Sequence, residues 1–287
     1  MADSEAFVEL RPLLFAVAYR MLGSATEAED VLQEAYLRWA DVAEASSPRA
    51  YLTTVVVRLC VDHLRSARVR RESYVGTWLP EPVLLDPEPD AVAVLADSVS
   101  LAFLVLLEEL TPVERGAFLL REVFGYEYGE IAAMLDRTEP SCRQLVSRAK
   151  RHVAERRTRF DADREQSREL TRQFLAACAT GDLDGLMSLL ARDVVVYTDG
   201  GGKAQAALRP VHGADKAGRL LIGISKKAVG FTVREVVLNG QPGVVLVVDS
   251  VVTTALVIDV VGSQVSAVRI IANPDKLTAV RLALSEQ

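Results

Sequence analysis

The sequence predicts a multidomain protein in which two all-α domains, the second a helix-turn-helix, precede an α+β domain. Three observations lead to this fold class. Apolar residues recur at helical spacing through about residue 155, a helix-turn-helix pattern lies between Thr111 and Val153, and after Asp193 the period changes from helical to alternating. At 287 residues, half of them hydrophobic, the chain is long enough for several domains with cores of their own.

The segment from Thr111 to Val153 holds the signals of a helix-turn-helix. Thr111 to Glu114 form a capping box with proline at the first helical position, and Gly125 can end that helix in the left-handed conformation. A short helix and a tight turn at Asp136-Arg137 follow, and Thr138 can cap the last helix. The buried face of this last helix is expected to carry Cys142, Leu145, Val146 and Ala149.

The opposite face of the last helix is basic and polar. Between residues 137 and 159 there are eight Arg and Lys residues and two acidic ones, although the chain as a whole has a net charge of −6. An ordinary three-helix bundle with a solvated basic face is the alternative, but so concentrated a charge favours DNA binding. Arg and Gln can read base edges in the major groove, while Arg and Lys hold phosphates. The residues expected to contact DNA here are Arg137, Thr138, Arg143, Gln144, Ser147, Arg148, Lys150 and Arg151.

The first 71 residues are predicted to form three helices. The first runs from about Ser4 to Leu22, and the second follows a capping box at Ser24 to Glu27. The second helix exposes an acidic face with Glu29, Asp30, Gln33 and Glu34. On residue type alone, the alternative is that this face does no more than keep the protein soluble. The third begins at Ser47-Pro48 and ends in Arg65, Arg68, Arg70 and Arg71. Those arginines either complement the helix dipole or bind phosphate.

Residues 72–96 are predicted to be a linker, because Pro80, Pro82, Pro87 and Pro89 disfavour a continuous helix. Its acidic residues are expected to keep it solvated. The content of aromatic residues and leucine is nevertheless high for an inert tether, so we expect the segment to dock on something.

The α+β domain spans residues 164–287, after a charged joint at 156–163. A helix from Glu165 to Gly181 and a short helix capped by Asp182 are followed by five segments with strand character, separated by Gly, Asn, Asp and Pro turns. Helices followed by a curved, mostly antiparallel sheet make an α+β cone.

Composition predicts a cytoplasmic protein. The N-terminus has no basic leader or apolar core, and the apolar stretch from Gly243 to Gly262 is broken by Asp249 and Asp259, so we expect two strands there and no membrane partner. The three cysteines have no metal or disulfide spacing and are expected to be buried thiols: Cys60, Cys142 and Cys178. No cofactor and no metal site are expected.

Three motifs in order carry a family resemblance: AEDVLQEAYLRW, SPRAYLTTVVVRLCVDHLRSARVRR, and the helix-turn-helix segment. They resemble the two domains of an extracytoplasmic-function (ECF) sigma factor of bacterial RNA polymerase, over about the first 155 residues. Residues 165–277 resemble, more weakly, the SnoaL-like group of the NTF2-like superfamily. The linker sequence TWLPEP is similar to that of the sigma subgroup with such an appended domain.

The resemblance implies roles for each segment. Residues 1–71 would be sigma-70 region 2 and residues 97–155 region 4, with core RNA polymerase and promoter DNA as partners. Asp30, Gln33 and Glu34 would dock on the polymerase clamp. The stretch from Trp39 to Arg58 would capture and melt the downstream promoter element. Residue types suited to unpaired DNA and its backbone are Arg49, Tyr51, Arg58 and Arg65, while Trp39 is suited either to this role or, by its spacing, to the core.

The C-terminal domain is expected to regulate the sigma domains in cis and to leave room for an unknown small ligand in its cone. Its regulatory residues would lie in three motifs: Trp78, Leu79, Pro80, Glu81 and Pro82; Asp199, Gly200, Gly201, Gly202 and Lys203; and Asn273, Pro274, Asp275, Lys276 and Leu277. The glycine-rich motif lacks the spacing of a phosphate-binding loop, so it is expected to contact the sigma domains or to shape the mouth of the cone.

No catalytic residue is expected. An enzyme would use Asp199, His212, Asp249 or Asp259 as its acid or base, but these form no recognisable dyad, and His212 next to Gly213 suggests a turn. Two other functions remain: a SnoaL-like enzyme or ligand sensor fused to a DNA-binding module, and a simple helix-turn-helix repressor. The repressor would leave the acidic helix and the element from Arg49 to Arg71 unexplained.

Overall fold

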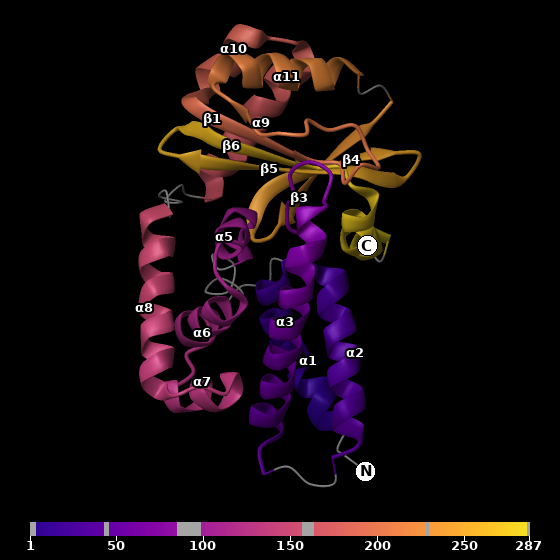
Figure 1. Cartoon of the computed structure of the whole chain (residues 1–287). Helices are drawn as coiled ribbons and strands as arrows, with labels where there is room; N and C mark the ends of the chain where they lie inside the picture. The colour runs from indigo at the N-terminus through magenta and orange to yellow at the C-terminus, as the bar shows by residue number, and fades with distance from the viewer. Residues whose placement is uncertain (1–3, 43–45, 85–98, 157–163, 228–229, 286–287) are drawn as a thin grey trace. The chain divides into compact units, whose positions relative to one another are not determined.

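The computed structural model describes residues 4–42, 46–84, 99–156, 164–227 and 230–285 (Figure 1). The chain divides into two compact units, one of residues 1–73 and 103–157, the other of residues 74–102 and 158–287. The chain therefore leaves the first unit after residue 73, contributes the linker to the second unit, and returns. Residues 85–96 of the linker predicted at 72–96, and residues 157–163 of the joint predicted at 156–163, lie outside the described residues.

The first unit is all-helical, as predicted. Thr111 caps its helix in a complete capping box with Pro112 in the first turn, and Gly125 has a φ of 71°. Asp136 takes the left-handed conformation that ends the next helix, with a φ of 53°. The helices are α1 (Ser4–Leu22), α2 (Ala25–Ala40), α3 (Pro48–Glu72), α5 (Leu101–Leu107, at the boundary with the second unit), α6 (Pro112–Glu122), α7 (Tyr128–Leu135) and α8 (Glu139–Arg156). Helix α5 was not predicted.

Helix α3 joins the two halves of the first unit, because it packs on α1 and α2 and also on α6 and α7 (Figure 1). Arg58 of α3 donates to the backbone oxygens of Met134 at 2.9 Å and Ala133 at 3.0 Å. The buried hydroxyls of Thr53 and Tyr126 lie 3.2 Å apart. The segments 1–71 and 97–155, expected as separate domains, therefore share one packed unit.

The second unit is α+β, as predicted, with a six-stranded sheet in the order β2-β1-β6-β5-β4-β3. All neighbouring strands are antiparallel except β1 and β6, which are parallel. The elements are α9 (Arg164–Thr180), α10 (Leu183–Leu189), β1 (Leu190–Asp199), β2 (Val211–His212), α11 (Ala214–Lys227), β3 (Thr232–Leu238), β4 (Gln241–Val248), β5 (Val251–Val261), β6 (Gln264–Ile271), the short 3₁₀ helix η2 (Pro274–Leu277) and α12 (Thr278–Ser285).

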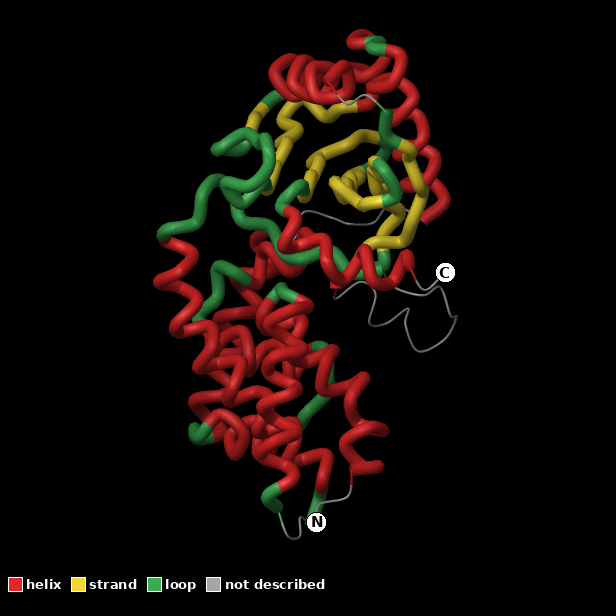
Figure 2. The backbone as a smooth tube through the Cα atoms, turned by 90° about the vertical axis from the view of Figure 1, so that its right-hand side faces the viewer, coloured by secondary structure: helices red, strands yellow, loops and turns green. Residues whose placement is uncertain are grey.

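The core of the second unit lies between α9, α10 and α11 and one face of the sheet. Phe174, Leu186 and Leu221 of the helices pack with Val196 and Val268 of the strands. The register shifts within β4–β5 and β5–β6, and such bulges bend and twist a sheet. The result is a strongly curved sheet with helices beside it (Figure 2). Helices α11 and α12 and strand β2 were not predicted.

The remaining sequence expectations concern cysteines and membrane spans. Cys60 and Cys142 are buried and Cys178 is half-buried, and burial raises the pKa of the Cys178 thiol to about 12. All three thiols are therefore protonated near neutral pH, because burial also raises the pKa of Cys60 and of Cys142. None of the helices in the described ranges is long and apolar enough to cross a membrane.

The contact between Tyr126 and Thr53 leads to a stability prediction. Tyr126→Phe removes one buried hydroxyl partner and should lower the free energy of unfolding by about 1 kcal/mol. Tyr36→Phe, at an exposed tyrosine of α2, should change it by much less. Urea unfolding followed by circular dichroism measures both, and equal effects would contradict a structural role for the buried pair.

Candidate nucleic-acid interface and linker clasp

Helix α8 presents a polar face to solvent, which we call the recognition face. Cys142, Val146 and Ala149 on the other side are buried. All eight side chains predicted for DNA contact at this helix are exposed: Arg137, Thr138, Arg143, Gln144, Ser147, Arg148, Lys150 and Arg151. Thr138 caps the helix, accepting from the Ser141 amide at 3.4 Å.

Two cations of the recognition face are held by neighbouring side chains. The Arg143 guanidinium lies 4.3 Å from the centroid of the Tyr128 ring and 3.3 Å from the Glu139 carboxylate. Lys150 Nζ lies 2.8 Å from Glu122 Oε2, and this hydrogen bond raises the pKa of Lys150. Ring stacking orients the planar Arg143 group without consuming its hydrogen-bond donors, which suits a residue that reads base edges.

The predicted acidic face of α2 is exposed at Asp30, Gln33 and Glu34. Glu34 pairs with Arg38 at 2.6 Å, an exposed ion pair one helical turn away. The opposite side of α2 contributes Val31, Leu32 and Ala35 to the core.

Trp39 lies in the core with 3% of its surface exposed, and its ring is 5.7 Å from that of half-buried Tyr51. Of the two roles left open for Trp39, the structure favours packing.

The predicted DNA-binding arginines of α3 are exposed, Arg58 and Arg65 line one pocket, and each of the three contacts a neighbouring group. The Arg49 guanidinium lies 5.8 Å from the centroid of the Tyr126 ring, and Arg65 pairs with Asp62 at 3.1 Å. Arg58 binds the carbonyl oxygens at the end of α7, where the helix dipole is negative. Two of its donor groups, Nε and Nη2, are thus occupied by these carbonyls.

In the second unit, Asp199 at the end of β1 binds the linker. One carboxylate oxygen accepts from Tyr74 Oη at 2.5 Å, and the other accepts from the Leu79 amide at 2.8 Å and from Lys276 Nζ at 2.7 Å. The Asp199 side chain is fully buried and that of Lys276 is 8% exposed. We call this set, together with Trp78 and Asn273, the linker clasp.

Lys276 completes the clasp from η2. Its ammonium donates to the Leu79 carbonyl at 2.5 Å and lies 4.2 Å from the centroid of the Trp78 ring and 4.9 Å from that of Tyr74. Burial, followed by the hydrogen bond to Asp199, raises the pKa of Tyr74 well above its usual value. A buried charge needs an opposite charge and hydrogen bonds, and the clasp supplies both to each member of the pair.

The glycine-rich motif makes room for the linker. A Cβ on Gly201 would collide with the Asn273 amide and lie 3.0 Å from Tyr74 Oη, and Gly201 has a φ of 57°. A Cβ on Gly202 would meet Val75. Lys203 pairs with Asp275 at 2.5 Å, which ties this motif to η2. The three predicted regulatory motifs therefore meet within one unit, and the described part of the linker is docked, as its aromatic and leucine content led us to expect.

Asn239 anchors the linker at a second place, and sequence reasoning missed it. Its side chain accepts from the Val83 amide at 3.1 Å and donates to the Val99 carbonyl at 2.9 Å, while Leu84 forms a bridge with Leu238. Asn239 has a φ of 51° in the Asn-Gly turn between β3 and β4. The Asn-Gly pair predicts such a turn, but nothing in it indicates that the side chain binds another segment.

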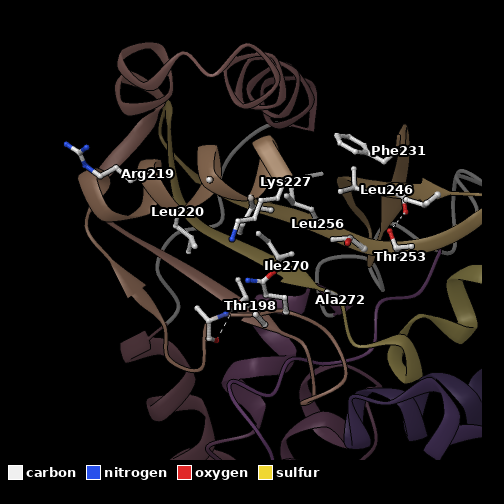
Figure 3. A pocket seen from close by; sticks show the side chains of 17 residues that line it. Thr198, Arg219, Leu220, Lys227, Phe231, Leu246, Thr253, Leu256, Ile270 and Ala272 are labelled. Carbon is white, nitrogen blue, oxygen red and sulfur yellow. Dashed lines mark hydrogen bonds between the residues drawn. The ribbon is translucent and has the colours of Figure 1, made fainter. Parts of the chain in front are cut away.

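A cavity of about 790 Å³ lies between α11 and the sheet (Figure 3). No Asp, Glu or His is among its lining residues, which run from Thr198 to Ala272. Asp259 is buried in an ion pair with Arg269 elsewhere in the sheet, and His212 and Asp249 are exposed. The cavity and the predicted acid–base candidates therefore do not coincide.

Comparison with known proteins identifies the family of the chain. The family model of sigma-70 region 2 matches residues 6–70, and that of sigma-70, region 4 matches residues 100–153. The chain is 42% identical to the ECF RNA polymerase sigma factor SigJ of Mycobacterium tuberculosis, over 95% of this chain and 92% of that protein. It is 33% identical to the probable ECF RNA polymerase sigma factor SigI of the same species, over 98% and 97%.

A crystal structure of the Mycobacterium tuberculosis ECF sigma factor SigJ matches with a TM-score of 0.77 and 37% identity, covering 96% of this chain and 99% of that one. Both sigma-70 regions are present, and the similarity extends through the C-terminal unit as well. The chain therefore belongs to the extracytoplasmic-function sigma factors, the alternative sigma factors that direct transcription by RNA polymerase.

Proposed function

We propose that the recognition face of α8 reads the upstream promoter element and that the acidic face of α2 binds core RNA polymerase. The observation that carries the first role is the complete exposure of eight polar side chains opposite a buried apolar face. The exposed carboxylates of Asp30 and Glu34 support the second, since charge complementarity guides such contacts. Region 2, at residues 1–71, would thus bind core RNA polymerase, and region 4, at residues 97–155, would read the upstream promoter element.

The recognition face gives a specificity prediction. Arg143→Ala should remove a bidentate base contact and cost roughly 1–3 kcal/mol on promoter DNA, with a much smaller loss on random DNA. Gln144→Ala should act in the same direction. Lys150→Ala should weaken both by a similar factor and reduce the salt dependence. Equal losses for Arg143→Ala on the two DNAs, measured by fluorescence anisotropy, would count against base reading.

The acidic face gives a second prediction. Asp30→Arg places a positive charge on the exposed side of α2 and should reduce binding to core polymerase at least several-fold. Glu9→Arg makes the same charge change on an exposed position of α1 and serves as the control. Undiminished co-purification of the Asp30 variant with core polymerase would leave this face with a role in solubility alone.

We further propose that the C-terminal unit regulates the sigma regions in cis through the linker clasp. The clasp fixes residues 74–84, and these residues connect the segment of region 2 to that of region 4 along the chain. A docked linker restricts the separation that the two regions can reach, whereas a released linker would allow them to move apart on a promoter. The docked state would be the inactive one.

The C-terminal unit is proposed to bind and not to catalyse. An enzyme of this fold needs an acid or base in its cavity, and the cavity is lined by apolar residues, threonines, one glutamine and two cations. Asp199, the most buried acidic candidate, is engaged by the linker and by Lys276.

The clasp gives a prediction that separates its two charges. Asp199→Asn or Lys276→Met alone leaves one charge buried beside a neutral partner and should destabilise the second unit by about 3–5 kcal/mol. The double variant should lose clearly less stability than the sum of the two single losses. In each, the Leu79 region should exchange amide hydrogens faster, and core polymerase binding should increase.

Asp275→Asn is the matched control, because it removes only the exposed pair with Lys203. Hydrogen exchange of residues 74–84 and run-off transcription are measured on the full chain. Faster exchange in the clasp variants without any change in polymerase binding or transcription would refute cis regulation while leaving the clasp itself intact.

A further inference from the structure

The cavity of the second unit has a mostly apolar wall. Leu220 of α11 lies across it from Leu256 and Ile270 of the sheet, and Phe231 lies at one end (Figure 3). Ile224 and Leu246 also belong to the lining. Its volume of about 790 Å³ falls within the range of sites that hold small organic ligands, roughly 300–1,000 Å³.

Two of the three lining threonines add little polarity to this wall, because their hydroxyls are already used. Thr254 and Gln205 are the other uncharged polar side chains of the lining. Thr198 Oγ1 bonds the amide and the carbonyl of Ala207, at 2.8 and 3.1 Å. Thr253 donates to the Leu246 carbonyl at 3.2 Å. A ligand body in this cavity therefore meets surface that favours carbon over hydrogen-bonding groups.

Two cations border the cavity, and they differ in what they face. Arg219 pairs with Asp215 at 3.0 Å, and its guanidinium extends away from the cavity (Figure 3). The Lys227 side chain extends toward the lining residues, and no carboxylate within the described ranges pairs with it. With no Asp or Glu in the lining, Lys227 gives the cavity a single positive charge beside an apolar wall.

We propose that this cavity binds an apolar small molecule that carries one carboxylate. The hydrocarbon body would lie against Leu220, Leu256 and Ile270, and the carboxylate would accept hydrogen bonds from Lys227. A nucleotide or another multiply charged anion would meet only one unpaired cation and would place its polar groups on carbon. A cationic ligand would be repelled by Lys227. The site does not depend on the cis regulation proposed above.

Decanoate and decan-1-ol are the probes, because they share a chain and differ in the charged group. Isothermal titration of the full-length protein should show decanoate binding roughly five- to tenfold more tightly than decan-1-ol, the contribution of a charge-assisted hydrogen bond. Lys227→Gln should abolish this difference by weakening decanoate alone.

Two further variants locate the site. Lys226→Gln makes the same change one residue earlier, where the side chain lies near Gly181 and does not line the cavity, and it should leave both affinities unchanged. Gly223 lines the cavity from within α11, and an added Cβ there would meet no atom within 4 Å. Gly223→Trp should therefore place a large side chain in the cavity, preserve the helix and weaken binding of both probes.

Thermal unfolding checks that each variant is folded. Each binding result then supports or contradicts the proposed carboxylate site. Failure of the wild-type chain to bind decanoate would overturn the proposal. Equal affinity for the two probes, or a decanoate affinity insensitive to Lys227→Gln, would exclude the carboxylate contact. Unchanged affinity for both probes in a folded Gly223→Trp variant would place the ligand elsewhere.

Discussion

The buried ion pair of Asp199 and Lys276 is the interaction on which the second unit's hold on the linker depends. Removing two charges from water is unfavourable, so the pair persists only where further groups satisfy both partners. The Leu79 amide and the Tyr74 hydroxyl satisfy Asp199, and the Leu79 carbonyl satisfies Lys276. Because these groups belong to the linker, the pair and the docked linker stabilise each other.

The residues around the pair are explained by the same constraint. Gly201 leaves the space that Asn273 and the Tyr74 hydroxyl occupy. Asn273 donates to that hydroxyl at 2.9 Å and caps η2 by accepting from the Asp275 amide at 3.2 Å. The cap orients the short helix that carries Lys276. A glycine, an asparagine and a turn, each common in loops, thus all help to hold the buried ion pair.

Local features of the fold could be predicted from sequence because their causes are local. The capping box at Thr111, the Asp182 cap and the β-branched run of β5 each depend on residues a few positions apart. Helix α11 was missed because Gly218 and Gly223 lower its helix propensity, so that packing of Ala217 and Leu221 decides its structure. The resemblance pointed to the motifs of the clasp. Their pairing could not be read from spacing, since Asp199 is 125 residues from Tyr74 and 77 from Lys276.

Arg58 shows a different limit of sequence reasoning. Its residue type and position suit DNA binding, yet its guanidinium holds the end of α7. Residue type alone does not distinguish a cation that is ready to bind phosphate from one that an internal carbonyl already occupies. Binding a phosphate through Nε and Nη2 would require Arg58 to release the end of α7.

The alternation of side chains at the end of β1 connects the two features of the second unit. Thr198 lines the cavity while its neighbour Asp199 binds the linker, and after β6 the same is true of Ala272 and Asn273. Adjacent residues of an extended segment face opposite ways, so each segment touches the cavity on one side and the clasp on the other. Thermodynamic reciprocity follows: if an occupant of the cavity binds more tightly when the linker is docked, it strengthens docking by the same factor, and if it binds more weakly, it favours release. The sigma factor would then respond to a bound metabolite through a change in the free energy of linker docking.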